Sequence, residues 1–163
     1  MRPELTAQRS AYPRRRTAKA SIAIHVARRF PASAERVFHA WLDPAIAGRW
    51  LFATATRPIA SVEIHPRVAG SFRFIDQRHG GRVTYGGEYT DIVPHRRLGF
   101  ILRSDADRHV ATRVRVEIAA WKQGSALTLL HEGVPPEYAS HTRARWIGML
   151  YGLGATLELL ALS

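Results

Sequence analysis

Apolar and polar residues alternate along most of the chain. A period of two predicts strands that have one face on a core. Seven segments show it: residues 21–30, 59–65, 70–77, 83–93, 97–103, 110–121 and 125–132. The breaks between the last six contain proline, glycine or short polar runs, which are typical of antiparallel hairpin turns. We therefore expect an antiparallel sheet of about seven strands, six of which follow one another directly.

Other segments have helical spacing. The pattern predicts two short helices after the first strand, over residues 34–42 and 45–50, with Asp43 as the cap of the second. A longer segment without proline runs from about residue 137 to 162. Its apolar stripe recurs at helical spacing and comprises Trp146, Leu150, Leu153, Leu157 and Leu160. The stripe predicts a long C-terminal helix that packs on the sheet.

These elements predict one α+β domain with an internal cavity. A seven-stranded sheet is too long to stay flat, so we expect it to curl around the C-terminal helix. Incomplete filling between a curved sheet and a straight helix leaves room for a ligand. The candidate ligand contacts are Trp50, Phe72, Phe74, Tyr89, Phe100, His131, Trp146 and Leu150. A solid core is the alternative, because aromatic strand faces have the same pattern in both cases.

Composition narrows the classes of function. The chain has 163 residues, of which 46% are apolar, which fits a single domain. It has no cysteine, so disulfides, thiolate nucleophiles and thiolate metal sites are excluded. No apolar run approaches the roughly 18 residues of a membrane span, and the start lacks the apolar stretch of a secretory signal. We expect a cytoplasmic protein.

Charge is unevenly distributed along the chain. The formal net charge is +11, and all but two of the 24 lysine and arginine residues are arginine, which indicates a GC-rich bacterial source. Residues 1–20 are strongly basic and lack apolar periodicity, so we expect a disordered basic arm before a domain over residues 21–163. Contacts of this arm with nucleic acid are expected to be nonspecific only.

His131 is the most suggestive polar residue, because it ends an apolar strand face. A histidine there could exchange protons near neutral pH, and Asp76, Glu88 or Asp91 could approach it from neighbouring strands. The alternative is a structural histidine whose hydrogen bonds are satisfied. The eight histidines are scattered singly, and neither a zinc motif nor a glycine-rich phosphate loop is present, so we expect no metal and no cofactor.

A set of short motifs points to a known family. They are FPASAERVF (residues 30–38), WLDP (41–44) with Trp50, VAGSFRF (68–74), GEYTDIVP (87–94), RLGF (97–100), LTLLHEG (127–133) and Trp146. Together they resemble the helix-grip superfamily, which includes START domains and the birch-pollen allergen fold. The similar branch is the one named for the C-terminal domain of the Hsp90 ATPase activator, and the resemblance covers about residues 21–160. Ala69 departs from the pattern, since it replaces the first of a usual glycine pair.

The resemblance implies a helix-grip fold and a limited set of functions. Members bind assorted apolar small molecules, some catalyse cyclisation or hydrolysis, and a few activate chaperones. We expect a carrier or sensor that binds an apolar small molecule. The alternatives are a small cyclase or hydrolase that uses His131 as acid-base, and a chaperone cofactor similar to the Hsp90 activator. The sequence is also compatible with a homodimer.

Overall fold

The computed structural model describes residues 20–53, 59, 61–78, 80–105 and 110–162. The elements are β1 (Ile22–Phe30), α1 (Ala34–Leu42), α2 (Pro44–Trp50), β2 (Ser61–Ile64), β3 (Ser71–Arg78), β4 (Gly81–Val93), β5 (Arg97–Ser104), β6 (Thr112–Trp121), β7 (Gly124–Val134) and α3 (Ala139–Ala161). A 3-10 turn (Pro136–Tyr138) precedes α3. The predicted basic arm, apart from its last residue, lies outside the described residues.

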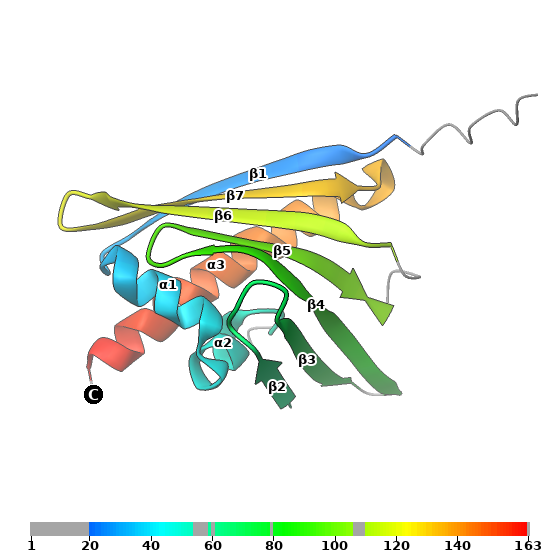
Figure 1. Ribbon diagram of the computed structural model, residues 1–163, viewed down its shortest axis with the longest axis horizontal. Coiled ribbons are helices and arrows are strands. Elements are labelled where there is room, and N and C mark those ends of the chain that lie inside the picture. Colours follow the sequence, from blue (N-terminus) through cyan, green and yellow to red (C-terminus); the bar gives the residue numbers. More distant parts are fainter. Residues whose placement is uncertain (1–19, 54–58, 60, 79, 106–109, 163) are drawn as a thin grey trace, which may run out of the picture.

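The strands form one antiparallel sheet in the order β1-β7-β6-β5-β4-β3-β2. Strands β2 to β7 pair in chain order, and β1 returns to pair with β7. Figure 1 shows α3 crossing behind the strands, with α1 and α2 near its C-terminal end. Register shifts in the β1–β7 pair and in the β4–β5 pair mark bulges, which bend a sheet. The predicted α+β helix-grip fold, with two short helices after the first strand, is confirmed.

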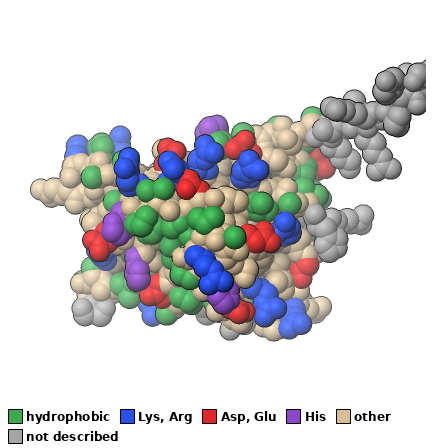
Figure 2. All heavy atoms as spheres, in the orientation of Figure 1, with side chains coloured by type: hydrophobic (Ala, Val, Ile, Leu, Met, Phe, Trp, Pro, Cys, Tyr) green, Lys and Arg blue, Asp and Glu red, His purple; other side chains and the backbone are tan. Residues whose placement is uncertain are grey.

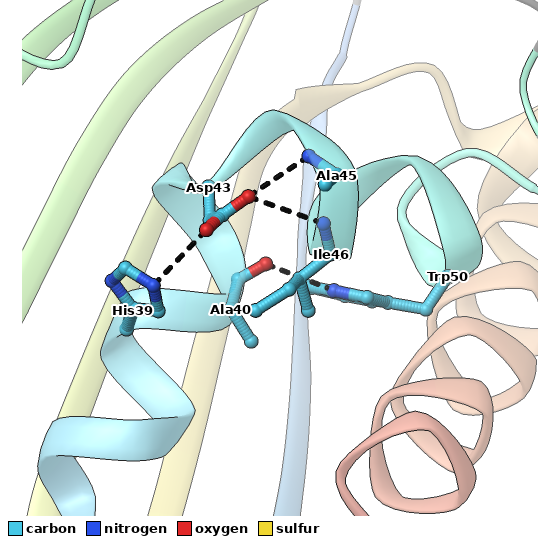
Figure 3. A network of polar contacts seen from close by, with 6 residues as sticks. All are labelled: His39, Ala40, Asp43, Ala45, Ile46 and Trp50. Carbon is cyan, nitrogen blue, oxygen red and sulfur yellow. Dashed lines mark hydrogen bonds and ion pairs between the residues drawn. The ribbon is translucent and has the colours of Figure 1, made fainter. Parts of the chain in front are cut away.

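The predicted Asp-Pro segment forms the corner between α1 and α2 (Figure 3). Asp43 Oδ1 accepts hydrogen bonds from the backbone N–H groups of Ala45 and Ile46, at 2.9 and 3.4 Å. These groups at a helix start have no partner within the helix, so the carboxylate stabilises the first turn of α2. Asp43 Oδ2 also lies 3.1 Å from His39 Nε2. One side chain therefore joins both helices.

Trp50 closes the same corner from inside. Its indole N–H donates to the Ala40 carbonyl at 3.0 Å, as Figure 3 shows. Its ring meets that of Trp41 edge to face, with centroids 4.6 Å apart. Trp50 is only 1% exposed. This side chain fixes the angle between α1 and α2 as part of the core.

The predicted stripe of α3 faces the core. Trp146, Leu150, Leu153 and Leu157 are buried, and Leu160 is half-buried. Contacts of α3 with β1 and α2 bury this face. Burying apolar surface contributes about 25 cal/mol per Å². The stripe is therefore the main attachment of the helix to the rest of the domain.

Gly148 lies on the opposite, exposed face of α3. A Cβ atom at this position would meet nothing within 4 Å. Glycine inside an exposed helix is less favourable than alanine by about 1 kcal/mol. Gly148→Ala should therefore raise the free energy of unfolding by about that amount, as measured by urea denaturation. A loss of stability would contradict a continuous helix through residue 148.

The turn between β2 and β3 contains the Ala69-Gly70 pair. Ala69 has a left-handed backbone, with φ of 66°. Its N–H donates to the Tyr89 carbonyl at 2.8 Å, and Gly70 N–H donates to the Arg67 carbonyl at 2.8 Å. A Cβ atom on Gly70 would lie 2.2 Å from the His65 carbonyl oxygen. The second position of the pair therefore needs glycine for lack of space, while the first tolerates alanine with backbone strain.

Candidate functional site

A cavity of about 500 Å³ lies between the first half of α3 and the sheet. This volume is within the range of about 300–1,000 Å³ that is typical of small-molecule sites. The apolar part of the wall comprises Phe52, Leu102, Val110, Val134, Trp146 and Met149, and the polar part includes Arg78, Tyr85, Thr112, His131, His141 and Arg145. The wall combines large apolar side chains with a few polar groups.

The structure brings two of the eight predicted contacts, His131 and Trp146, to this cavity. Phe72, Phe74, Tyr89 and Phe100 instead surround a separate void of only about 10 Å³. Trp50 and Leu150 are each 1% exposed within the core cluster. These six side chains pack where we expected open space, because the bulky aromatic rings fill it. As ligand contacts, the eight residues stay a prediction.

Several residues that line the cavity were not predicted from the sequence as ligand contacts. Tyr85 precedes the predicted Tyr89 by four positions on β4, and Thr112 is two positions before Val114, which pairs with His131. Residues separated by even numbers share a strand face, so this signal was present. On α3, Thr142 and Met149 share a face with Trp146 at helical spacing. On β3, Arg78 lies an even number of positions after Phe72 and Phe74, so it had the same signal. Arg145 directly precedes Trp146, outside the apolar stripe of α3, and had no comparable signal.

His131 lies in a chain of hydrogen bonds that runs from α3 to β5. Trp146 Nε1–H donates to His131 Nδ1 at 2.9 Å. An indole N–H can only donate, so Nδ1 carries no proton. The ring hydrogen is then on Nε2, which donates to Thr112 Oγ1 at 2.7 Å, and the Thr112 hydroxyl donates to the Leu102 carbonyl at 3.4 Å. These hydrogen bonds identify the His131 ring as neutral, with both of its nitrogens engaged.

Burial reinforces the neutral state of His131. Its side chain is nearly inaccessible, with 5% exposure. Desolvation lowers the pKa of His131 from 6.5 to about 4, because a charged ring would lose its water. At neutral pH the ring is uncharged and has no free acceptor. Proton exchange with a ligand would require the chain of hydrogen bonds to open.

The three predicted carboxylate partners lie elsewhere. Asp76 Oδ2 accepts from Arg78 at 2.9 Å, Glu88 pairs with Arg103, and Asp91 pairs with Arg97. Glu88 and Asp91 are solvent-exposed, and Figure 2 shows that acidic and basic side chains are interspersed on the visible face. Within the part of the chain that the structure describes, no hydrogen bond or ion pair joins any of the three to His131. The carboxylate-histidine pair does not form in this structure.

Tyr85 organises the polar end of the cavity. Its hydroxyl accepts hydrogen bonds from Arg78 Nη2 at 3.1 Å and from Arg145 Nη2 at 3.2 Å. The Arg145 guanidinium also lies over the Tyr85 ring, 5.3 Å from its centroid. Phe52 also stacks on Tyr85, with ring centroids 4.6 Å apart. Tyr85 is 4% exposed, so a buried phenol holds two cationic side chains at the cavity wall.

The described residues do not bring three or more histidine, aspartate or glutamate side chains together as a metal site would need. No helix formed by these residues is long and apolar enough to span a bilayer.

Solved structures of other proteins share this fold. A protein from Chromobacterium violaceum is 26% identical, with a TM-score of 0.72, and the match covers 82% of this chain and 94% of that one. A protein from Rhizobium loti is 27% identical, with a TM-score of 0.69 and coverage of 84% and 97%. A Staphylococcus aureus protein of unknown function is 15% identical with a TM-score of 0.80, covering 88% and 98%. No curated protein matches the chain at a significant level.

A family model gives the same result from the sequence. The model described as "Activator of Hsp90 ATPase homolog 1-like protein" matches residues 31–158, which is most of the chain. The match includes the α1-α2 corner, the Ala69-Gly70 turn, His131 and Trp146. The chain belongs to the Activator of Hsp90 ATPase homolog 1-like family.

Proposed function

We propose that this protein binds an apolar small molecule in the cavity beside α3 and acts as a carrier or sensor. The observation that carries the proposal is a space of about 500 Å³ with Phe52, Trp146 and Met149 in its wall. Burial of about 200 Å² of apolar ligand surface would contribute about 5 kcal/mol at 25 cal/mol per Å². Family membership supports a binding role, although the fold alone does not fix function.

The enzymatic alternative has less support. A general base needs a free acceptor within reach of the substrate proton. In His131, Nδ1 accepts from Trp146 and Nε2 donates to Thr112, at 2.9 and 2.7 Å. His131 is therefore better suited to holding Trp146 in position than to exchanging protons with a substrate. The chaperone-cofactor alternative rests on the family name alone.

Blocking the cavity tests the binding proposal. Thr142 is a half-buried wall residue on α3, and an indole at this position would project into the space. The uncharged probe N-phenyl-1-naphthylamine becomes fluorescent in apolar surroundings. Thr142→Trp should weaken its binding by about tenfold or more, because the lost apolar contacts are worth more than about 1.4 kcal/mol.

The matched control is Thr128→Trp, which adds the same side chain at an exposed position on β7. This variant should bind the probe as the wild type does. Native mass spectra of gently purified protein, recorded beside denaturing spectra, would also reveal any small molecule that co-purifies. Equal probe affinity in a folded Thr142→Trp variant would remove the cavity as the binding site.

A further inference from the structure

The positive charges at the Tyr85 end of the cavity exceed the negative ones. Arg78 and Arg145 donate to the same Tyr85 oxygen, so their guanidinium groups lie side by side. Arg78 is paired with Asp76, whose side chain is 4% exposed. Among the described residues Arg145 forms no ion pair, and no wall residue is acidic. Within the described residues, one guanidinium charge at the cavity wall therefore has no acidic partner.

The unused donors at this end fit an anion. Arg145 has five N–H hydrogens, and its hydrogen bond to Tyr85 uses one of them. Tyr85 accepts two hydrogen bonds, and as a phenol it also carries one hydroxyl hydrogen that can donate. A planar carboxylate can accept two parallel bonds from one guanidinium. The Arg145 guanidinium and the Tyr85 hydroxyl therefore offer hydrogen-bond donors that suit a carboxylate acceptor on a ligand.

His131, another polar residue of the wall, does not compete for such an anion. His131 uses both ring nitrogens within the protein, and burial keeps the ring uncharged at neutral pH. Beside it lie the apolar side chains of Trp146 and Val134. The wall thus combines the donors of Arg145 and Tyr85 with a histidine whose two ring nitrogens are already engaged.

We infer that the ligand is an amphipathic anion, with an apolar body beside Trp146 and one carboxylate or similar acidic group bound by Arg145 and Tyr85. This inference rests on the proposed function and narrows it to a chemical class. Apolar contacts supply affinity along the body of the ligand. The acidic group sets the orientation of the ligand, because placing its charge against the apolar side chains instead would bury it without a partner.

Two probes with one scaffold test the inference. 8-Anilinonaphthalene-1-sulfonate carries an anionic group, whereas N-phenyl-1-naphthylamine has the same aromatic rings without it. Arg145→Gln should weaken binding of the sulfonate by about tenfold, the usual effect of losing a hydrogen bond to a charged group. The same variant should change binding of the neutral probe less than about twofold.

The matched control is Arg143→Gln, since Arg143 is exposed on the same helix and is absent from the cavity wall. It should leave both affinities as in the wild type. A second variant, Arg145→Lys, keeps the charge but loses the planar fork, so sulfonate affinity should fall between those of wild type and Arg145→Gln. Near-ultraviolet circular dichroism checks that each variant is folded.

The possible results separate the two proposals. Equal losses for both probes in Arg145→Gln, or an equal sulfonate loss in Arg143→Gln, would overturn the anionic ligand and leave the cavity as a binding site. Binding of neither probe to the wild type would overturn the proposed function itself. In the wild type, sulfonate binding should also weaken as salt is raised to about 0.5 M, and unchanged affinity would count against the ion pair.

Discussion

Between pH 7 and pH 4, the free energy of unfolding should fall by about 3 kcal/mol through His131. Burial lowers the pKa of this ring from 6.5 to about 4 in the folded protein, while the unfolded chain keeps the ordinary value. One pKa unit corresponds to about 1.4 kcal/mol. The Trp146 N–H bond to Nδ1 contributes to this preference, since a protonated Nδ1 cannot accept it.

The sign follows from the protons bound in each state. Between pH 6.5 and pH 4 the unfolded chain binds a proton at His131 that the folded protein excludes. The stabilisation is thus complete above pH 6.5 and is lost as the pH falls to about 4. Urea denaturation at a series of pH values measures the change directly.

His131→Asn provides the control. An asparagine oxygen can accept from Trp146 in the place of Nδ1 but does not titrate in this range. The two proteins differ at this one residue only, so the difference between the two stability curves isolates His131. Parallel curves from pH 7 to pH 4 would show that the ring is not kept neutral by burial.

Gly70→Ala should destabilise the protein by about 3 kcal/mol or more, since the new atom would overlap a backbone oxygen. The Cβ position lies 2.2 Å from the His65 carbonyl and 2.8 Å from the Arg67 carbonyl. Neither oxygen can rotate away as a side chain could. The carbonyl of Gly70 itself accepts a hydrogen bond from Tyr89 N–H at 2.9 Å, so a shift of the turn would also disturb β4.

The adjacent substitution should have the opposite effect. Ala69→Gly removes the strain of a left-handed alanine and restores the glycine pair from which this chain departs. The expected gain is up to about 1 kcal/mol, less than the strain itself because glycine also loses more entropy on folding. Thermal unfolding of both variants beside the wild type compares them. A stable Gly70→Ala protein would mean that the turn can be rebuilt at little cost.

The order and type of the elements could be predicted because local patterns determine them. Alternation marks each strand whatever its neighbours, and Asp43 caps α2 through atoms two and three residues away. The stripe from Trp146 to Leu157 has a period set by the helix itself. In each case the signal and the structure that it predicts lie within a few residues.

The position of the cavity depends on volume, which no local pattern reports. Phe72 and Phe100 pack edge to face with ring centroids 5.3 Å apart, and so close the space in which we expected a ligand. The open space lies beside the first half of α3, where Arg145 and Tyr85 meet across 60 residues of sequence. The bond between Trp146 and His131 likewise depends on two ring orientations. Such contacts follow from the packing of the whole domain.

The open ends of the sheet affect how copies of the chain behave when concentrated. Strands β1 and β2 end the sheet order, and within the described residues each pairs on one side only. Exposed strand edges invite intermolecular pairing and aggregation. Strand β2 has only 4 residues, and β1 carries Arg28 and Arg29 near its end. A short edge and a charged edge both discourage the addition of a strand from another molecule.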